Sequence, residues 1–324
     1  MEEVIIIGGG PAGLSAALIL GRCRRKVLLF DSGRPRNAYS NGMHGYLSRD
    51  GVSPQDFLSI SRNELKAYPN VRIIDTEVTE ARKEHGLFVI KTTDNETFQS
   101  KRLLIATGVV DSIPVLEGIG ELWGKSVFTC PYCDGWEYSD KPLAVFGKNS
   151  RGLNLSIALK NSWSQDVILF THGPSELSEE QKEELKRNKI PFIETKIRRL
   201  VGEEGKLEQV ELEDGSFIKR DALFFNTPSW IRSKLLEQLG CPFTESDGVQ
   251  TGKYEQTKVP GLFVAGNILR DVQLAIVAAG EGAEAAFGIN VSLCNEVRTR
   301  DDDSLYTPGA SPEADQGARA SFSP

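Results

Sequence analysis

Short apolar runs alternate along the chain with longer segments that carry many polar residues. The apolar runs are rich in β-branched and aromatic residues, which predicts strands buried on both faces of a parallel sheet. The segments between them, rich in Ala and Leu or in Glu and Lys, predict helices. The predicted strands, with the turns that end some of them, are 4–7, 26–31, 102–108, 142–147, 167–170 and 262–266, and the predicted helices are 14–20, 153–160, 179–187 and 272–290.

Strands and helices alternate in this pattern, which is typical of α/β proteins. The order strand, glycine turn, helix, strand occurs at the N-terminus and again from residue 142, so we predict two Rossmann-like domains of three layers, ββα. Short alternating segments at 72–74 and 87–91 predict a small antiparallel excursion. Residues 208–213 and 216–219 flank Asp214-Gly215 and predict a hairpin.

The first glycine turn carries a dinucleotide-binding pattern. Gly8, Gly10 and Gly13 have the spacing that lets a backbone turn tightly, approach a pyrophosphate and pack a helix closely on a strand. Asp31 ends the next strand, where a carboxylate can accept a hydrogen bond from a ribose hydroxyl. The alternative is a turn that serves packing alone, but the strand–helix–strand context and Asp31 favour a nucleotide site.

The second glycine turn departs from this pattern. The stretch Gly147-Lys148-Asn149-Ser150-Arg151-Gly152 keeps the outer glycines, but Asn149 occupies the middle position, where a side chain obstructs close approach of a pyrophosphate. The next strand leads into Thr171-His172-Gly173, without the adjacent arginines that would bind a 2′-phosphate. Lys148 and Arg151 can attract an anion, or can simply be solvated surface charges. We therefore expect NADPH to bind poorly at this turn.

Two cysteines with two residues between them form the main chemical motif, Cys130-Pro131-Tyr132-Cys133, and Asp134 follows at once. Disulfide exchange needs an attacking thiolate and a proton for the leaving thiolate, and these groups supply both. The alternative is half of a zinc site, which needs a second closely spaced Cys or His pair. Since the other cysteines and the histidines are scattered, we predict a redox-active disulfide and no metal site.

Composition narrows the class of protein. The 324 residues are 40% hydrophobic and 26% charged, as in globular proteins of two ordinary domains. The net charge of −7 argues against nucleic-acid and anionic-membrane partners, and no apolar run is long enough to span a bilayer. The first strand begins directly after the N-terminal residues, so we expect no signal peptide. With few cysteines in a long chain, we expect a protein of the reducing cytoplasm.

Three stretches together resemble the low-molecular-weight thioredoxin reductases, from about residue 3 to residue 292. The first is the turn at 8–13 with Ala106-Thr107-Gly108. The second is Cys130-x-x-Cys133-Asp134-Gly135, placed just before the second nucleotide fold. The third runs from Pro260 to Asn267 and continues through Val272-Gln273-Leu274-Ala275 to Gly282. Chance rarely places all three in this order, so the resemblance is specific.

The resemblance implies a homodimeric FAD protein with a thioredoxin reductase-like fold. Its FAD-binding domain would comprise residues 1–113 and 238–297, and the inserted domain, 114–237, would carry the redox disulfide. Residues 298–324 are rich in Asp, Ser, Pro and Ala without periodicity, which predicts a disordered tail.

Roles of individual residues also follow from the resemblance. Cys133 would face the flavin, Cys130 would exchange with the substrate, and Asp134 would move the proton. Asn267 stands where the family usually has an Asp that binds the ribityl chain, and an amide can still hydrogen-bond a hydroxyl. The residues expected to hold FAD are Gly8, Gly10, Pro11, Ala12, Gly13, Asp31, Ala106, Thr107, Gly108, Gly266, Asn267, Val272, Gln273 and Leu274.

The altered second turn is similar to branches of this family that do not use pyridine nucleotides. These are the diflavin-linked disulfide oxidoreductases, the ferredoxin-linked flavin thioredoxin reductases and the gliotoxin-type dithiol oxidases. The dithiol oxidases typically have His where this chain has Asp134, which favours a bacterial-type disulfide oxidoreductase.

We therefore expect an FAD-dependent enzyme that passes electrons between its flavin and the Cys130–Cys133 disulfide. The expected partner is a thioredoxin-like protein or a small dithiol, with ferredoxin or flavodoxin as candidate donor. The resemblance also suggests a second FAD in the altered fold. Three alternatives stay open: an oxygen-dependent dithiol oxidase, an ordinary NADPH thioredoxin reductase, and a redox-sensing flavin-binding module without turnover.

Overall fold

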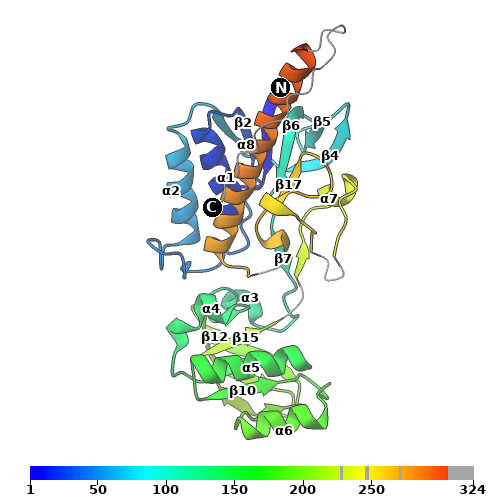
Figure 1. Ribbon diagram of the computed structural model, residues 1–324. Helices are drawn as coiled ribbons and strands as arrows, with labels where there is room; N and C mark the ends of the chain where they lie inside the picture. Colours follow the sequence, from blue (N-terminus) through cyan, green and yellow to red (C-terminus); the bar gives the residue numbers. More distant parts are fainter. Residues whose placement is uncertain (227–228, 245–247, 270–271, 306–324) are drawn as a thin grey trace, which may run out of the picture.

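The computed structural model describes residues 1–226, 229–244, 248–269 and 272–305, with side chains up to residue 297. Two domains lie one above the other in Figure 1. The larger domain contains both ends of the described chain, and the middle of the chain forms the inserted domain below it. Two short strands, β7 (Val109–Asp111) and β16 (Ser229–Ile231), pair antiparallel where the chain passes between the domains.

The larger domain is built on a mixed sheet. Its strands are β1 (Glu2–Ile7), β2 (Val27–Phe30), β3 (Val71–Ile74), β4 (Val78–Glu84), β5 (Leu87–Thr92) and β6 (Thr97–Ile105), in the order β3-β2-β1-β6-β5-β4, with β17 (Leu262–Val264) also paired to β6. β3, β2, β1, β6 and β17 run parallel, whereas β4, β5 and the start of β6 form an antiparallel meander.

Our prediction of an antiparallel excursion at 72–74 is wrong, and the prediction at 87–91 is confirmed. β3 pairs parallel with β2, because α2 (Pro54–Leu65) lies between them and carries the chain back to the other end of the sheet.

Two helices of the larger domain, α1 (Pro11–Arg22) and α8 (Ala275–Leu305), pack against each other beside the sheet. Small residues permit the close crossing: a Cβ at Gly282 would lie 2.0 Å from the Ala12 carbonyl oxygen. α8 extends to Leu305, so our predicted disordered tail is wrong for 298–305. Once a helix has formed, each added residue gains a backbone hydrogen bond, and this allows the helix to continue past 297. Residues 306–324 lie outside the described residues.

The inserted domain contains a parallel sheet in the order β11-β10-β9-β15-β8. Helices α5 and α6 and a meander of three strands complete it, and the predicted hairpin at 208–219 is part of that meander. Its elements are β8 (Val127–Phe128), β9 (Leu143–Phe146), α5 (Ser150–Ser162), β10 (Val167–Phe170), α6 (Glu179–Arg187), β11 (Phe192–Ile193), β12 (Ile197–Glu203), β13 (Lys206–Leu212), β14 (Phe217–Lys219) and β15 (Ala222–Phe225).

The chain returns to the larger domain earlier than residue 238. Leu235 and Leu236 are buried in the core of the larger domain together with β1, β6 and β17, so the predicted boundary at 237/238 is too late. The remaining short elements are α3 (Ile119–Leu122), α4 (Pro131–Asp134), η1 (Trp136–Tyr138), α7 (Leu235–Gln238), η2 (Lys253–Glu255) and η3 (Asn267–Leu269). Among the described helices, none combines the length and apolar character needed to cross a bilayer.

Candidate functional site

One cavity of about 970 Å³ brings together the residues that the sequence singled out. It extends from the first glycine turn of the larger domain to the disulfide of the inserted domain. Gly13 and Val272 do not line it, and Val272 is exposed. The predicted residues that do line it are Gly8, Gly10, Pro11, Ala12, Asp31, Ala106, Thr107, Gly108, Cys130, Cys133, Asp134, Gly266, Asn267, Gln273 and Leu274.

The three glycines of the first turn differ in what surrounds them. Gly8 has a φ of +115°, and a Cβ there would lie 2.3 Å from the Ala106 carbonyl oxygen. A Cβ at Gly13 would lie 1.8 Å from the Gly8 carbonyl oxygen, so Gly13 is required for packing of the turn against α1. A Cβ at Gly10 would meet nothing within 4 Å. Of these three glycines, Gly10 is therefore the one that leaves space in the cavity.

Two unsatisfied features beside this space suit a phosphate-containing ligand. Gly10 is the N-cap of α1, and no side chain caps this helix end, so its positive dipole end faces the cavity lined by Gly10 to Ala12. The Thr107 hydroxyl is buried in the cavity wall without a hydrogen-bond partner. A buried polar atom of this kind normally has a partner, which a bound ligand can provide.

Asp31 lies at the cavity end of β2, and neighbouring groups hold its carboxylate. Arg62 of α2 donates to Asp31 Oδ2 at 2.5 Å and, through its other terminal nitrogen, to Asp75 at 2.8 Å. The Gly33 N–H donates to Asp31 Oδ1 at 3.1 Å. The carboxylate is thus fixed beside the glycine turn, where a ribose hydroxyl can reach it.

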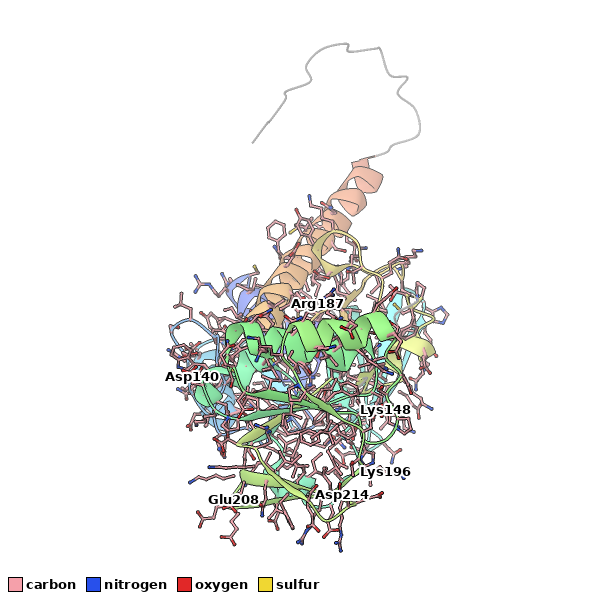
Figure 2. All side chains as sticks on the ribbon, turned by 90° about the horizontal axis from the view of Figure 1, so that it is seen from below. Asp140, Lys148, Arg187, Lys196, Glu208 and Asp214 are labelled. Carbon is pink, nitrogen blue, oxygen red and sulfur yellow. A yellow bond between two sulfur atoms is a disulfide. The ribbon has the colours of Figure 1, made fainter. Side chains whose placement is uncertain are left out.

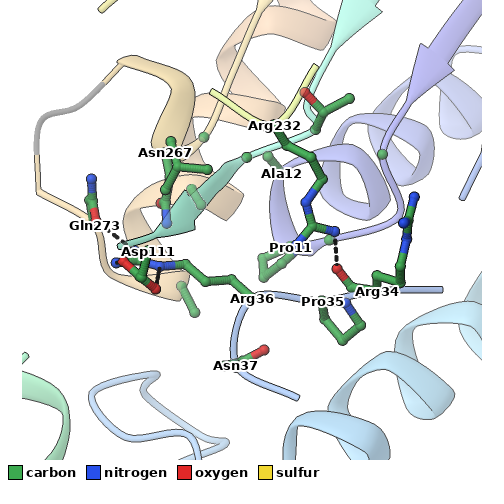
Figure 3. Close-up of a pocket in the computed structure, with 18 of the residues that line it drawn as sticks. Pro11, Ala12, Arg34, Pro35, Arg36, Asn37, Asp111, Arg232, Asn267 and Gln273 are labelled. Atoms are coloured by element: carbon green, nitrogen blue, oxygen red, sulfur yellow. Dashed lines mark hydrogen bonds and ion pairs between the residues drawn. The ribbon is translucent and has the colours of Figure 1, made fainter. Parts of the chain in front are cut away.

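A polar cluster that the sequence did not indicate joins three distant segments in this cavity (Figure 3). Arg36 donates through Nε and Nη2 to the two carboxylate oxygens of Asp111, at 2.7 and 2.5 Å. Its Nη1 donates to Gln273 Oε1 at 2.6 Å. Asp111 belongs to β7 and Gln273 precedes α8, so Arg36 ties the link between the domains to the C-terminal part of the site.

The segment after β17 completes the larger-domain side of the cavity. Gly266 adopts a φ of +83°, and its N–H donates to the Glu281 carboxylate at 2.7 Å. Asn267 follows at the start of η3 and lines the cavity close to Asp111 and Gln273 in Figure 3. An amide at this point offers both a donor and an acceptor to a hydroxylated chain.

Cys130 and Cys133 form a disulfide at the other end of the cavity. Cys130 is the N-cap of α4, and its Sγ accepts a hydrogen bond from the Cys133 N–H at 3.1 Å. Both cysteines are half-buried, so the bond is reachable but partly shielded. The predicted pairing of these two cysteines is present in the structure.

Asp134 follows Cys133 directly and lines the same cavity. Burial, and secondarily the charge of Glu137, raise the pKa of the Asp134 carboxyl from 3.8 to about 7. A carboxyl with a pKa near neutrality is present in both protonation states at physiological pH, so it can donate and accept protons. Its position next to Cys133 and in the same cavity wall suits proton transfer to a leaving thiolate.

The second glycine turn is closed by the chain itself. The Asn149 side chain caps α5, its Oδ1 accepting from the Arg151 N–H at 3.1 Å. The Glu176 N–H donates to the Lys148 carbonyl oxygen at 2.8 Å, which ties the loop after β10 to this turn. In the first turn, by contrast, the helix end has no side-chain cap. The Arg151 N–H, one of the backbone donors at this helix end, is therefore already occupied in the second turn.

The charges around the second turn lie at the edge of the inserted domain. Figure 2 shows Lys148 and Lys196 on the same side of this domain. Burial, and then the charges of these two lysines, lower the pKa of His172, whose Nδ1 accepts from the Ile197 N–H at 3.0 Å. The segment Thr171-His172-Gly173 thus offers a largely neutral imidazole rather than paired guanidinium groups.

Comparison with known proteins covers both domains. Residues 2–282 match the family described as pyridine nucleotide-disulphide oxidoreductase. A probable thioredoxin reductase of Arthroderma benhamiae is 31% identical over 329 residues, which cover 91% of this chain and 81% of that protein.

Two solved structures are also similar over almost the whole chain. The structure of HlmI shares 36% identity, with a TM-score of 0.90, over 94% of this chain and 96% of the other. A putative thioredoxin reductase, TrxB, of Bacillus anthracis shares 35% identity, with a TM-score of 0.87, over 92% of this chain and 100% of the other. These similarities confirm the predicted α/β fold with Rossmann-type domains.

Proposed function

We propose that NADPH is not the reductant of this chain, although the chain belongs to the pyridine nucleotide-disulphide oxidoreductases and is a thioredoxin reductase-like flavin disulfide oxidoreductase. In this proposal it passes electrons between FAD and the Cys130–Cys133 disulfide, and between that disulfide and an external dithiol or disulfide. The observation that carries the proposal is the side-chain cap that Asn149 places on α5. A nucleotide pyrophosphate would have to displace the Asn149 side chain to reach the Arg151 N–H.

The residues around the first turn fit FAD. The uncapped end of α1 and the space at Gly10 suit its pyrophosphate, and Asp31 suits its adenosine ribose. Thr107 and Asn267 line the cavity beyond the turn, where hydroxyl-bearing parts of the ligand can use their side chains. When bound, FAD supplies the redox group that accepts or returns the electron pair.

The disulfide would exchange with substrate in two balanced steps. A thiolate of the substrate attacks Cys130 Sγ, the Cys130–Cys133 bond breaks, and Cys133 leaves with the electron pair. Asp134, in its neutral form, gives its proton to the departing sulfur. The second substrate thiolate then attacks the substrate sulfur bound to Cys130, which releases the Cys130 thiolate and an oxidised substrate. The substrate becomes a disulfide, and the enzyme is left with a Cys133 thiol, a Cys130 thiolate and an ionised Asp134.

The proposed exchange partner is a thioredoxin-like protein or a small dithiol. The relatives named as thioredoxin reductases support the first of these. In the reducing direction, ferredoxin or flavodoxin would supply electrons. We also propose that the protein forms a homodimer and works in the cytoplasm. We further propose one FAD per chain, since the Asn149 side chain caps the helix end of the second turn, whereas the helix end of the first turn has no side-chain cap.

Two measurements test this proposal. Flavin extracted from the folded protein should amount to one FAD per chain, and two would contradict the single-site proposal. Photoreduced protein should then be reoxidised rapidly by a thioredoxin disulfide under anaerobic conditions. Rapid reoxidation by oxygen, with no response to thioredoxin disulfide, would favour the dithiol oxidase instead.

A further inference from the structure

One loop of the larger domain reaches across to the disulfide centre of the inserted domain. It carries His44, whose Nε2 lies 3.5 Å from Glu137 Oε1 in η1 and whose Nδ1 lies 3.7 Å from Asp50 Oδ1 in its own loop. η1 begins two residues after Asp134, at the end of α4. His44, Cys133 and Asp134 line the same cavity. An imidazole from one domain thus faces the acidic side of the redox centre in the other.

Backbone contacts fix the position of this loop. The Met43 N–H donates to the Val52 carbonyl oxygen at 2.8 Å, and the Gly45 N–H donates to the Asp50 carboxylate at 2.8 Å. At the start of the loop, Tyr39 lies so close to Gly124 that a Cβ at Gly124 would be 2.8 Å from the Tyr39 carbonyl carbon. Gly124 also has a φ of +73°, which glycine adopts most readily. The contact between the domains is therefore built into the backbone.

The charges that face Asp134 are mostly negative. Glu137 disfavours the ionised form of Asp134, and Tyr138, in the same 3-10 helix, has its pKa raised by burial first and then by Asp134, Asp221 and Glu137. The Lys141 ammonium lies over the Tyr138 ring, 4.8 Å from its centroid, and donates to the backbone carbonyl of Glu137. The Glu137 carboxylate itself is therefore approached by His44 from the other domain.

We propose that His44 is a positioning residue of the redox centre, which offsets the charge of Glu137 beside Asp134 and thereby sets the pH at which Asp134 exchanges its proton. This inference rests on the acid–base role proposed for Asp134. The His44 imidazole, with Nε2 3.5 Å from Glu137 Oε1, offsets part of the charge of this carboxylate, so the ionised form of Asp134 is less disfavoured. Removing the imidazole leaves Glu137 uncompensated and keeps Asp134 protonated to higher pH.

The test is the pH dependence of flavin reduction by dithiothreitol, measured anaerobically in the FAD-loaded protein. His44→Gln should move the midpoint of this profile upward by about 0.3 to 0.7 pH unit, the size expected of a partly exposed charge pair. Glu137→Gln should move it downward, and His44→Gln added to Glu137→Gln should have no further effect. His85→Gln is the matched control, since His85 is exposed at the turn between β4 and β5.

The outcomes separate this inference from the function on which it rests. If wild-type flavin is not reduced by the dithiol, or if Asp134→Asn reduces as fast as wild type, the proposed function or the role of Asp134 fails. If Asp134→Asn is slow but His44→Gln has the wild-type profile, the inference about His44 is overturned. Should His44→Gln fail to retain FAD, His44→Asn takes its place: an upward displacement of the midpoint supports the inference, and a wild-type profile overturns it.

Discussion

Replacing Asp134 by Asn should stabilise the protein at neutral and alkaline pH while impairing its chemistry. The carboxyl is largely buried in the native protein, and its pKa is raised from 3.8 to about 7. A carboxyl whose pKa is higher in the native state than in the unfolded state contributes its full stability at pH values below the unfolded-state pKa. This contribution to the free energy of unfolding is lost as the pH rises to the native-state pKa. The full loss corresponds to about 4 kcal/mol, since one pKa unit equals about 1.4 kcal/mol. Asn cannot ionise, so the variant avoids this loss.

Urea unfolding of the oxidised protein, at a fixed excess of FAD, measures the effect. The free energy of unfolding of Asp134→Asn minus that of wild type should rise by about 3 kcal/mol between about pH 5 and about pH 8.5, and should level off above about pH 7. Asp140→Asn, at an exposed position in the same domain, is the control and should show no comparable rise. Parallel curves for Asp134→Asn and wild type would refute the argument, because the Asp134 carboxyl would then be ionised well below neutrality.

The same variant should keep its FAD but slow electron transfer from a dithiol to the flavin by about 10²- to 10⁴-fold, as loss of a general acid does; a stopped-flow effect below about tenfold would reduce Asp134 to a structural role. Gly10→Val should abolish FAD binding and leave the fold intact by circular dichroism, because its side chain enters open cavity space; retention of FAD would contradict the pyrophosphate site. Gly13→Ala should instead destabilise the fold, since its Cβ meets the Gly8 carbonyl oxygen. Cys130→Ser should leave a Cys133 thiolate that gives a long-wavelength charge-transfer band with the flavin, and Cys133→Ser should lack it; identical spectra would show that the proposed division of roles is wrong.

The regular elements could be predicted because their signals are local. β10 and α6 have the bounds that the sequence indicated, since one is an uninterrupted apolar run and the other a charged segment that starts with a Ser178–Gln181 capping box. β4 was not predicted, because its sequence Val-Thr-Glu-Ala-Arg-Lys-Glu is polar and only Val78 and Ala81 are buried. It lies at the edge of the sheet, where one face stays in solvent.

In the candidate site, too, residues within short motifs could be predicted and contacts between distant segments could not. Glycine spacing and the paired cysteines made Gly8, Gly10, Cys130 and Cys133 predictable, because each motif is a short stretch with its own chemistry. Val272 was placed in the site by resemblance alone and is exposed outside the cavity. The contacts of Arg36 with Asp111 and Gln273 had no sequence signal, since they join segments separated by 75 and 237 positions, which only the folded chain brings together.

Independence from NADPH is tested most directly by anaerobic stopped-flow mixing of the purified flavoprotein with NADPH and, separately, with dithiothreitol. Absorbance of the flavin reports reduction in both cases. The capped second turn, with Asn149 bonded to Arg151, predicts that the dithiol reduces the flavin while NADPH reduces it far too slowly for turnover. Rapid, saturable reduction at micromolar NADPH would contradict this and identify an ordinary NADPH-dependent thioredoxin reductase.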